Sequence, residues 1–289
     1  MTDNNITLSF LLKELKLSLM AKNWQSKSEE AHKKSLSYAD FLAILCEEEI
    51  ANRYHARTLR LIRESKLPIT KTLTSFDFNN AKNINKQQIN HLANDSSWIK
   101  NNENLLIFGP SGVGKTHLAA AIANSLIVKK SIRVKFISTV TLIQHLQKAK
   151  QVFSLIDELS KLDKYQLLIL DDIGYVKKTS NEAEVLFELI SHRYESGSMI
   201  ITANQPFSEW NKIFEDNMMT VAAIDRLIHH ATIIECNEES FRKKESLQKK
   251  QNLLKVNGNI NGDIDYKNDG NDSGNNDAIG ESVGLKKFG

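Results

Sequence analysis

The fold of this chain is decided by the stretch Gly109-Pro110-Ser111-Gly112-Val113-Gly114-Lys115-Thr116. These residues match G-x-x-x-x-G-K-[ST], the Walker A loop that binds nucleotide phosphates. Glycine lets the backbone curl so that successive N–H groups point at phosphate oxygens, and the following helix directs its positive end at the same anion. Lys115 brings a positive charge to the β- and γ-phosphates, and the Thr116 hydroxyl can bind magnesium. We therefore expect residues 109–116, together with His117, to bind the phosphates of a nucleotide.

The residues on either side of the loop support this interpretation. Leu105-Leu106-Ile107-Phe108 is a short apolar run typical of a buried parallel strand, and residues 116–128 are rich in the helix formers alanine and leucine. The chain has 12 glycines, of which seven follow residue 256, and three of the other five lie in this loop. Glycine is therefore concentrated where positive φ angles are needed.

Composition limits the class of protein. A chain of 289 residues with 41% hydrophobic residues can form one or two domains plus tails. Its net charge of +3 permits nucleic-acid binding without arguing for it. Cys46 and Cys236 have no metal or redox spacing and are expected to be reduced thiols. The first residues lack a basic signal-peptide region, and no apolar run approaches the roughly 18 residues of a membrane span, so we expect a soluble, cytoplasmic protein without a membrane partner.

Apolar runs alternate with helical stretches through the middle of the chain. The expected strands are residues 105–108, 133–137, 167–171, 198–202 and 231–235. Such alternation predicts an α/β fold, a P-loop NTPase with a parallel five-stranded sheet flanked by helices. Residues 139–162 are long enough for two helices between strands, one more than the minimum.

The rest of the chain divides around this region. Residues 1–68 are expected to form an N-terminal helical domain, because leucines from Leu8 to Leu19 keep a helical period and Ser37-Tyr38-Ala39-Asp40 is a capping box that opens a second helix. Pro68 ends this unit, and residues 69–103 are interpreted as a polar linker that carries Phe76-Asp77-Phe78 and two short helical pieces. The nucleotide-binding domain is placed at 104–245. Residues 246–289 are expected to be a disordered tail, since 19 of the 33 residues from 257 onward are Asn, Gly or Asp.

Two further strands end in polar groups that suit phosphate chemistry. Leu167-Leu168-Ile169-Leu170-Asp171-Asp172 is a Walker B pattern, in which a buried strand carries carboxylates to the sheet edge beside the phosphate loop. Asp171 is expected to hold magnesium, and Asp172 to orient or deprotonate the attacking water. Asn204 follows the expected strand at 198–202, where its amide can reach the γ-phosphate or that water.

These motifs, in this order, resemble an AAA+ ATPase. More narrowly, the chain resembles the IstB-like ATPases, helper proteins of insertion-sequence transposition that are related to DnaC-type helicase loaders. The matching stretches are Leu11-Leu-Lys-Glu-Leu-Lys-Leu17, Leu67-Pro-Ile-Thr-Lys-Thr-Leu73, Phe76-Asp-Phe78, residues 104–118, Asp172-Ile-Gly-Tyr175, Glu188-Leu-Ile-Ser-His-Arg-Tyr194, Asn204-Gln-Pro-Phe-Ser-Glu-Trp210 and Ala222-Ala-Ile-Asp-Arg-Leu-Ile-His-His230. The last two are the most specific, because a generic P-loop enzyme has no need of them.

The resemblance implies several roles. Asn204 matches the sensor 1 position, and Arg226 matches an arginine finger that reaches the nucleotide of a neighbouring subunit. ATP and magnesium would bind between subunits of a homo-oligomer, a ring or helical filament on duplex DNA, which recruits a transposase. The N-terminal helices would be the adaptor, and the extra helix within 139–162 would be the insertion of the initiator and loader clade. Asp172 departs from the glutamate common at its position, which implies slow hydrolysis, and Arg242 is the nearest candidate for a sensor 2 arginine.

Several alternatives stay open at this level. The runner-up is a DnaC-like replicative helicase loader, which would act on single strands. A stand-alone P-loop kinase would need neither a trans arginine nor the N-terminal helices, and a GTPase would need Asn-Lys-x-Asp, which neither Asn85-Lys86 nor Asn211-Lys212 provides. A scaffold that binds ATP without hydrolysing it is a third class.

Some arginines also have two interpretations. The run Arg53, Arg57, Arg60 and Arg63 suits either DNA phosphates or, as we favour, a solvated helix face with nearby glutamates. Arg193 suits a DNA pore or a neighbouring subunit, and Arg226 suits either the finger or an internal salt bridge with Asp225 or Glu235.

Overall fold

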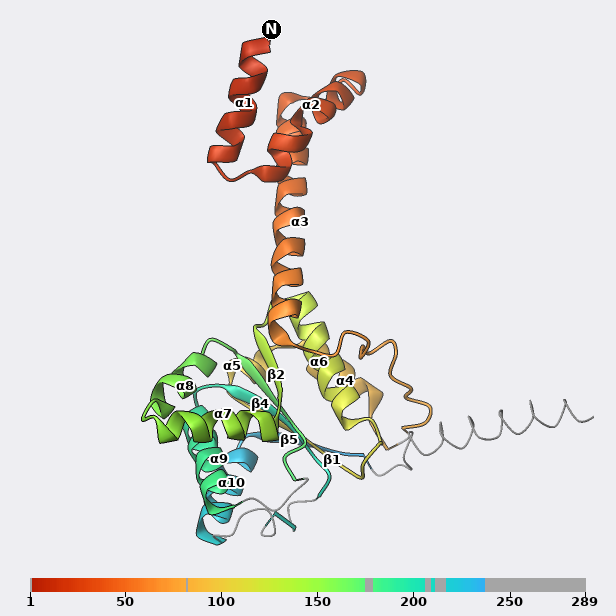
Figure 1. The fold of residues 1–289 in the computed structure, drawn as a ribbon. Helices are drawn as coiled ribbons and strands as arrows, with labels where there is room; N and C mark the ends of the chain where they lie inside the picture. The colour runs from red at the N-terminus through yellow and green to blue at the C-terminus, as the bar shows by residue number, and fades with distance from the viewer. Residues whose placement is uncertain (1, 82, 175–178, 206–208, 211–216, 237–289) are drawn as a thin grey trace, which may run out of the picture. The chain divides into compact units, whose positions relative to one another are not determined.

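The computed structural model describes residues 2–81, 83–174, 179–205, 209–210 and 217–236 (Figure 1). Its centre is a parallel sheet with the strand order β2-β3-β4-β1-β5. The strands are β1 (Asn104–Phe108), β2 (Val134–Ser138), β3 (Leu167–Asp171), β4 (Ser198–Ala203) and β5 (Ala231–Glu235). Each lies within one residue of its expected position, so the predicted α/β fold is confirmed.

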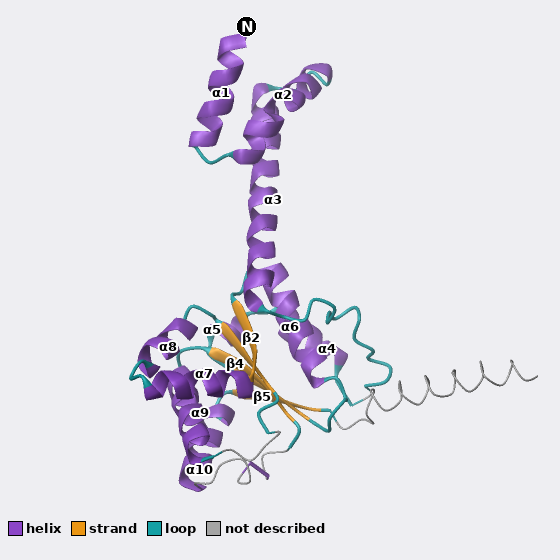
Figure 2. Cartoon of the chain, viewed as in Figure 1, coloured by secondary structure: helices purple, strands orange, loops and turns teal. Residues whose placement is uncertain are grey.

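Helices cover both faces of the sheet (Figure 2). On β1, Leu105 and Ile107 pack into one apolar cluster, while Leu106 and Phe108 pack into the other, because side chains alternate along a strand. The first cluster includes α4 (Lys86–Asn94) and α6 (Lys115–Lys130). The second includes α7 (Thr139–Gln151), α8 (Leu155–Leu162), α9 (Ser180–Arg193) and α10 (Asn217–Ile228). Burial on both faces explains why the strands are continuous apolar runs.

The stretch 139–162 contains two helices, as its length predicts. The chain turns between α7 and α8 at Phe153, which has a φ of 55° and an almost fully exposed ring. Leu142, Leu146 and Leu159 face the sheet and anchor both helices in the second cluster.

Residues 69–103 pack into the body of the protein. Phe76, Ile89, Leu92 and Trp98 are buried in the same cluster as α6, and the short helix α5 (Ser97–Lys100) lies against β4. Polar residues separate these apolar ones along the chain, so the composition suggested a linker, whereas α4 gathers its apolar side chains on one face. The domain boundaries proposed around this segment stay a prediction.

Three helices, rather than two, precede this segment: α1 (Thr2–Glu14), α2 (Ser18–Lys33) and α3 (Tyr38–Ser65). The first break falls at Lys16, whose φ of 57° ends α1 without a glycine. One of the two bonds of the predicted capping box is present, since the Ser37 hydroxyl accepts from the Asp40 N–H at 3.1 Å, while the Asp40 carboxylate accepts from the Ser37 hydroxyl instead of its N–H. The far end of α3 joins the core through Leu61.

Two sequence predictions fall outside the described residues: the tail at 246–289 and the role of Arg242. Within the described residues, every helix is too short or too polar to cross a membrane.

Candidate nucleotide-binding site

Glycine is required at three points of the Walker A loop. Gly109, Gly112 and Gly114 have φ angles of 145°, 87° and 99°, which other residues rarely adopt. A Cβ at Gly109 would also lie 2.1 Å from the Cys236 carbonyl oxygen. The loop therefore curls between the end of β1 and the start of α6 in the way that its sequence predicts.

Lys115 is buried at the start of α6 and points across the sheet edge. Its ammonium donates to the carbonyl oxygens of Gly109 at 2.7 Å and Pro110 at 2.8 Å, and to Asn204 Oδ1 at 2.7 Å. The charge is thus held between the phosphate loop and the end of β4, where phosphate oxygens would meet it.

The Walker B residue Asp171 lies beside the hydroxyl that the Walker A motif supplies. Its Oδ1 accepts from Thr116 Oγ1 and from Thr202 Oγ1, both at 2.8 Å. A carboxylate next to a hydroxyl at the N-terminus of α6 is an all-oxygen donor set of the kind that magnesium takes together with phosphate. Thr116 and Asp171 therefore fit the magnesium role predicted for them.

Asn204 connects Lys115 to Asp172. Its amide nitrogen donates to Asp172 Oδ1 at 2.7 Å, while its amide oxygen accepts from Lys115. Asp172 has a φ of 63°, and its N–H donates to Thr202 Oγ1 at 2.8 Å. The left-handed turn directly after β3 therefore directs this carboxylate toward the end of the neighbouring strand β4.

A cavity of about 240 Å³ lies over these groups. Its lining residues are Lys71, Ser111, Gly112, Gly114, Lys115, Thr116, His117, Asp171, Asp172, Thr202 and Asn204. Most of the expected site residues therefore come together. The exceptions in the loop are Gly109 and Pro110, which contribute carbonyl oxygens to Lys115, and Val113, whose side chain is buried in the core beneath the loop.

Two lining residues had no predicted role. Thr202 belongs to a strand that the sequence located, and its hydroxyl position follows from the pairing of β3 with β4. Lys71 precedes the Walker A loop by about forty residues and stands in the Leu67–Leu73 stretch that carried part of the family resemblance. That resemblance was the only signal for it in the sequence.

His117 connects the start of α6 to residues 72–76. Its Nε2 lies 3.1 Å from both the Thr72 carbonyl oxygen and Ser75 Oγ. Its ring meets the Phe76 ring edge to face, with centroids 5.3 Å apart. Burial lowers the pKa of His117, which favours the neutral ring that can donate one N–H to Thr72.

Comparison with known proteins agrees with this geometry. Residues 10–249 match the family described as IstB-like ATP binding protein. The chain belongs to this family. It is 45% identical to an insertion sequence ATP-binding protein of Sinorhizobium fredii over 86% of this chain and 84% of that one. It is 37% identical to the IS21 insertion sequence ATP-binding protein of Pseudomonas aeruginosa over 82% of this chain and 89% of that one.

Among solved structures, the DnaC helicase loader is similar to this IstB-like protein. The two are 20% identical with a TM-score of 0.48, over 58% of this chain and 97% of that one. The family assignment rests on the sequence relatives.

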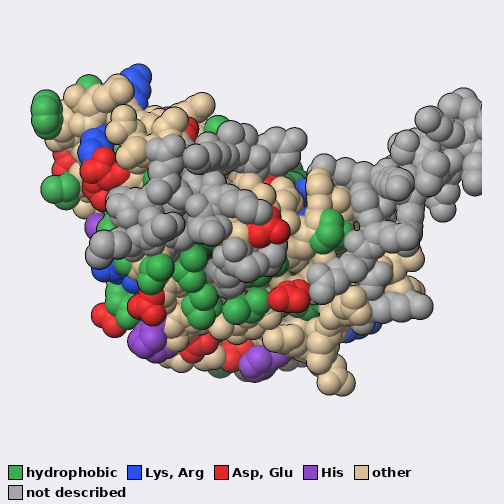
Figure 3. Space-filling view, turned by 90° about the horizontal axis from the view of Figure 1, so that it is seen from below, with side chains coloured by type: hydrophobic (Ala, Val, Ile, Leu, Met, Phe, Trp, Pro, Cys, Tyr) green, Lys and Arg blue, Asp and Glu red, His purple; other side chains and the backbone are tan. Residues whose placement is uncertain are grey.

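Arg226 is not brought to the cavity of this IstB-like chain. It lies on α10, with its guanidinium carbon 5.0 Å from the centre of the Phe187 ring on α9 and one N–H directed to the Ala222 carbonyl oxygen. Seen from below, the described side chains on this face mix acidic, basic, histidine and hydrophobic groups (Figure 3). The finger role of Arg226 stays a prediction.

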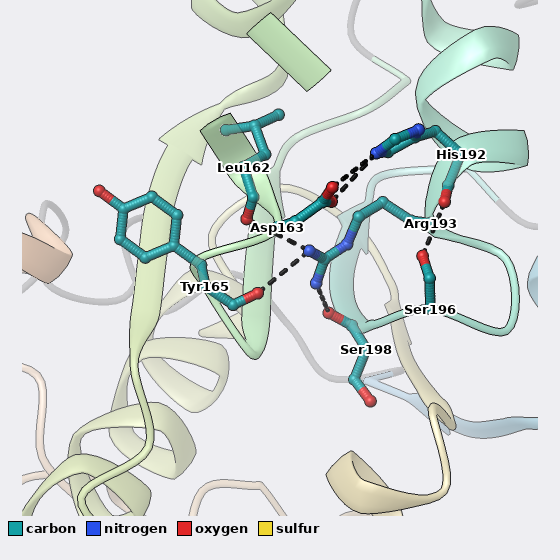
Figure 4. Close-up of polar contacts among 7 residues, drawn as sticks. All are labelled: Leu162, Asp163, Tyr165, His192, Arg193, Ser196 and Ser198. Atoms are coloured by element: carbon teal, nitrogen blue, oxygen red, sulfur yellow. Dashed lines mark hydrogen bonds and ion pairs between the residues drawn. The ribbon is translucent and has the colours of Figure 1, made fainter. Parts of the chain in front are cut away.

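Arg193 is buried, so the idea that it faces a DNA pore or a neighbouring subunit is wrong. Figure 4 shows its guanidinium among the carbonyl oxygens of Leu162, Tyr165 and Ser198, at 3.3, 3.0 and 3.1 Å. Burial lowers the pKa of Arg193. A Cβ at Gly197 would lie 2.5 Å from the guanidinium carbon, so this glycine makes room for it. Arg193 therefore joins the C-terminal end of α9 to the sheet through its hydrogen bond with Ser198 on β4.

Proposed function

We propose that this IstB-like protein is an ATPase that couples ATP to protein assembly on duplex DNA during insertion-sequence transposition. The observation that carries the proposal is the connection through Asn204, which joins Lys115 to Asp172 beside the Thr116–Asp171 pair. Nucleotide binding by the loop requires Lys115 but not its connection to Asp172. The arrangement of a cation, a carboxylate and an amide at one sheet edge supports hydrolysis as well as binding.

Each residue then has a chemical task. The N–H groups of residues 111–116 bind phosphate oxygens, and Lys115 leaves its protein oxygens to neutralise charge on the β- and γ-phosphates. Magnesium, when bound, would neutralise further charge on the phosphates. Asp172 holds and deprotonates the attacking water, and Asn204 sets the direction of that carboxylate. Aspartate is shorter than glutamate by one methylene, so hydrolysis is expected to be slow.

The names of the sequence relatives support the biological setting. They are insertion sequence ATP-binding proteins, and the chain covers most of their length. We infer that subunits assemble as a ring or helical filament with duplex DNA, that Arg226 of one subunit completes the site of the next, and that a transposase is the partner. The helices α1–α3 would be the adaptor that meets this partner.

Steady-state ATP hydrolysis with no DNA, with duplex DNA and with single-stranded DNA tests the proposal. The expected result is magnesium-dependent hydrolysis that duplex DNA stimulates, and Lys115→Ala is the inactive control. Stimulation by single strands alone would favour the helicase-loader alternative. ATP binding without hydrolysis under every condition would favour the scaffold.

A further inference from the structure

Lys71 lines the nucleotide cavity, although it lies far from the Walker motifs in sequence. It is half-buried, and within the described part of the chain its ammonium has no hydrogen bond or ion pair, while its backbone N–H donates to the Pro68 carbonyl oxygen at 3.1 Å. A lysine placed among phosphate-binding groups without a carboxylate partner is available to an anionic ligand.

Hydrogen bonds and packing fix the position of the segment that carries Lys71. Ser75 Oγ accepts from the Thr72 N–H at 3.0 Å, and Thr72 Oγ1 accepts from the Ser75 N–H at 3.2 Å, which closes a tight turn. Phe76 next to this turn is buried in the core. A Cβ at Gly114 would lie 3.2 Å from the Phe76 ring, so the segment packs directly against the Walker A loop.

His117 fastens the turn from the other side, through its contacts with the Thr72 carbonyl oxygen and Ser75 Oγ. The charge of Lys71 contributes to lowering the pKa of His117, which agrees with their closeness. Lys71 is therefore carried by a turn that is attached to the same helix start that binds phosphate.

The groups that line the cavity fall into two chemically different sets. Asn204 joins Asp172 to Lys115, which reaches the β- and γ-phosphates, so these residues belong to the proposed hydrolysis site. Lys71 instead directly precedes Thr72, whose carbonyl oxygen lies 3.1 Å from His117 Nε2 at the start of α6, and the loop before this helix cradles the α- and β-phosphates.

We propose that Lys71 is a nucleotide-binding residue whose ammonium contacts the α-phosphate, with His117 as its positioning residue. The inference rests on the proposed ATP site and adds a contact that ATP and ADP share. Such a contact raises affinity for both nucleotides equally and leaves the rate of the chemical step unchanged.

Calorimetric titration of the full chain with ATP and with ADP tests the proposal. Lys71→Met keeps the length of the side chain and removes its charge, and Lys100→Met at the exposed end of α5 is the matched control. We expect Lys71→Met to weaken both nucleotides by about ten- to a hundred-fold, with kcat near that of the wild type and the control unchanged. Lys71→Gln replaces Lys71→Met if the latter has a lower melting temperature.

Affinities within twofold of the wild type would overturn the proposal, as would a loss confined to ATP, which would place Lys71 at the γ-phosphate. Failure of the ATP site itself is distinguishable, because Lys115→Ala would then also bind ATP normally.

The positioning role of His117 is tested in a double-mutant cycle. His117→Ala should weaken ADP binding in the wild type but have little further effect in Lys71→Met, because its effect passes through Lys71. Equal losses in both backgrounds would show that His117 acts independently and would overturn that part of the proposal.

Discussion

The side chains of Asn204 and Asp172 share a hydrogen bond of 2.7 Å between the ends of two adjacent strands. The bond uses the amide nitrogen of Asn204, which leaves the amide oxygen for Lys115. Asn204 therefore stands between Lys115, which would bind phosphate, and Asp172, the carboxylate proposed to act on water. If the proposed roles hold, nucleotide binding at Lys115 is coupled to the geometry of hydrolysis through Asn204.

Lys115→Ala is expected to abolish tight ATP binding. The substitution removes the positive charge for the β- and γ-phosphates in a partly enclosed site, where an uncompensated anion is costly. Fluorescence or filter-binding titration with ATP measures the effect. Unchanged affinity would mean that the loop at 109–116 is not the nucleotide site.

Asp172→Asn is expected to keep ATP and magnesium bound while slowing hydrolysis by about a hundred- to ten-thousand-fold. Asparagine retains an oxygen that can accept from Asn204, so the geometry survives, but it cannot take a proton at neutral pH. Single-turnover hydrolysis after nucleotide binding measures the step directly. Hydrolysis at the wild-type rate would show that Asp172 is not the general base and that another carboxylate has this role.

Arg226→Ala is expected to leave ATP binding by one subunit intact and to lower assembly-dependent hydrolysis by about a thousand-fold or more. The test mixes it with Lys115→Ala, which lacks the loop lysine but retains its arginine. Trans action predicts partial recovery of DNA-stimulated hydrolysis in the mixture. Activities that merely add would favour an internal role, such as the contact with Phe187.

Glu49→Gln is expected to destabilise the N-terminal helices by about 1–3 kcal/mol. Buried Glu49 on α3 caps the start of α2, since Oε2 accepts from the N–H groups of Leu19 at 2.8 Å and Met20 at 3.2 Å, and Oε1 accepts from Arg53 at 2.9 Å. Thermal unfolding measures the change, with exposed Glu47→Gln as the control. Equal melting temperatures for Glu49→Gln and the wild type would contradict the capping role.

The same contacts set a pH dependence. Burial raises the pKa of Glu49, but the hydrogen bonds from Arg53, Met20 and Leu19 outweigh it, so the pKa is lowered overall. A carboxyl whose pKa is lower in the folded state stabilises the fold above its unfolded value, and the stabilisation is lost as pH falls through the folded value. The difference between wild type and Glu49→Gln is therefore expected to shrink in acid, below about pH 4.

Sequence patterns located the strands and the phosphate loop accurately, while they missed the break at Lys16 and the packing of residues 69–103. A buried parallel strand is a local apolar run, and a Walker A loop has a fixed spacing, so both can be predicted from the sequence without knowledge of the fold. The helix break at Lys16 depends on a left-handed backbone conformation at a residue that is not glycine, and no sequence pattern predicts that conformation. The core role of Trp98 and Phe76 depends on helices that come later in the chain.

The sequence by itself determined the α/β sheet, the nucleotide loop and the Walker B acids, because each depends on residues that are neighbours along the chain. Only the tertiary structure decided that Arg193 is enclosed by carbonyl oxygens, that Asn204 joins Lys115 to Asp172, and that Lys71 enters the nucleotide cavity. In each of these cases an isolated polar residue takes its role from groups tens of positions away. Burial and partners of that kind arise only when the packed elements bring those groups together.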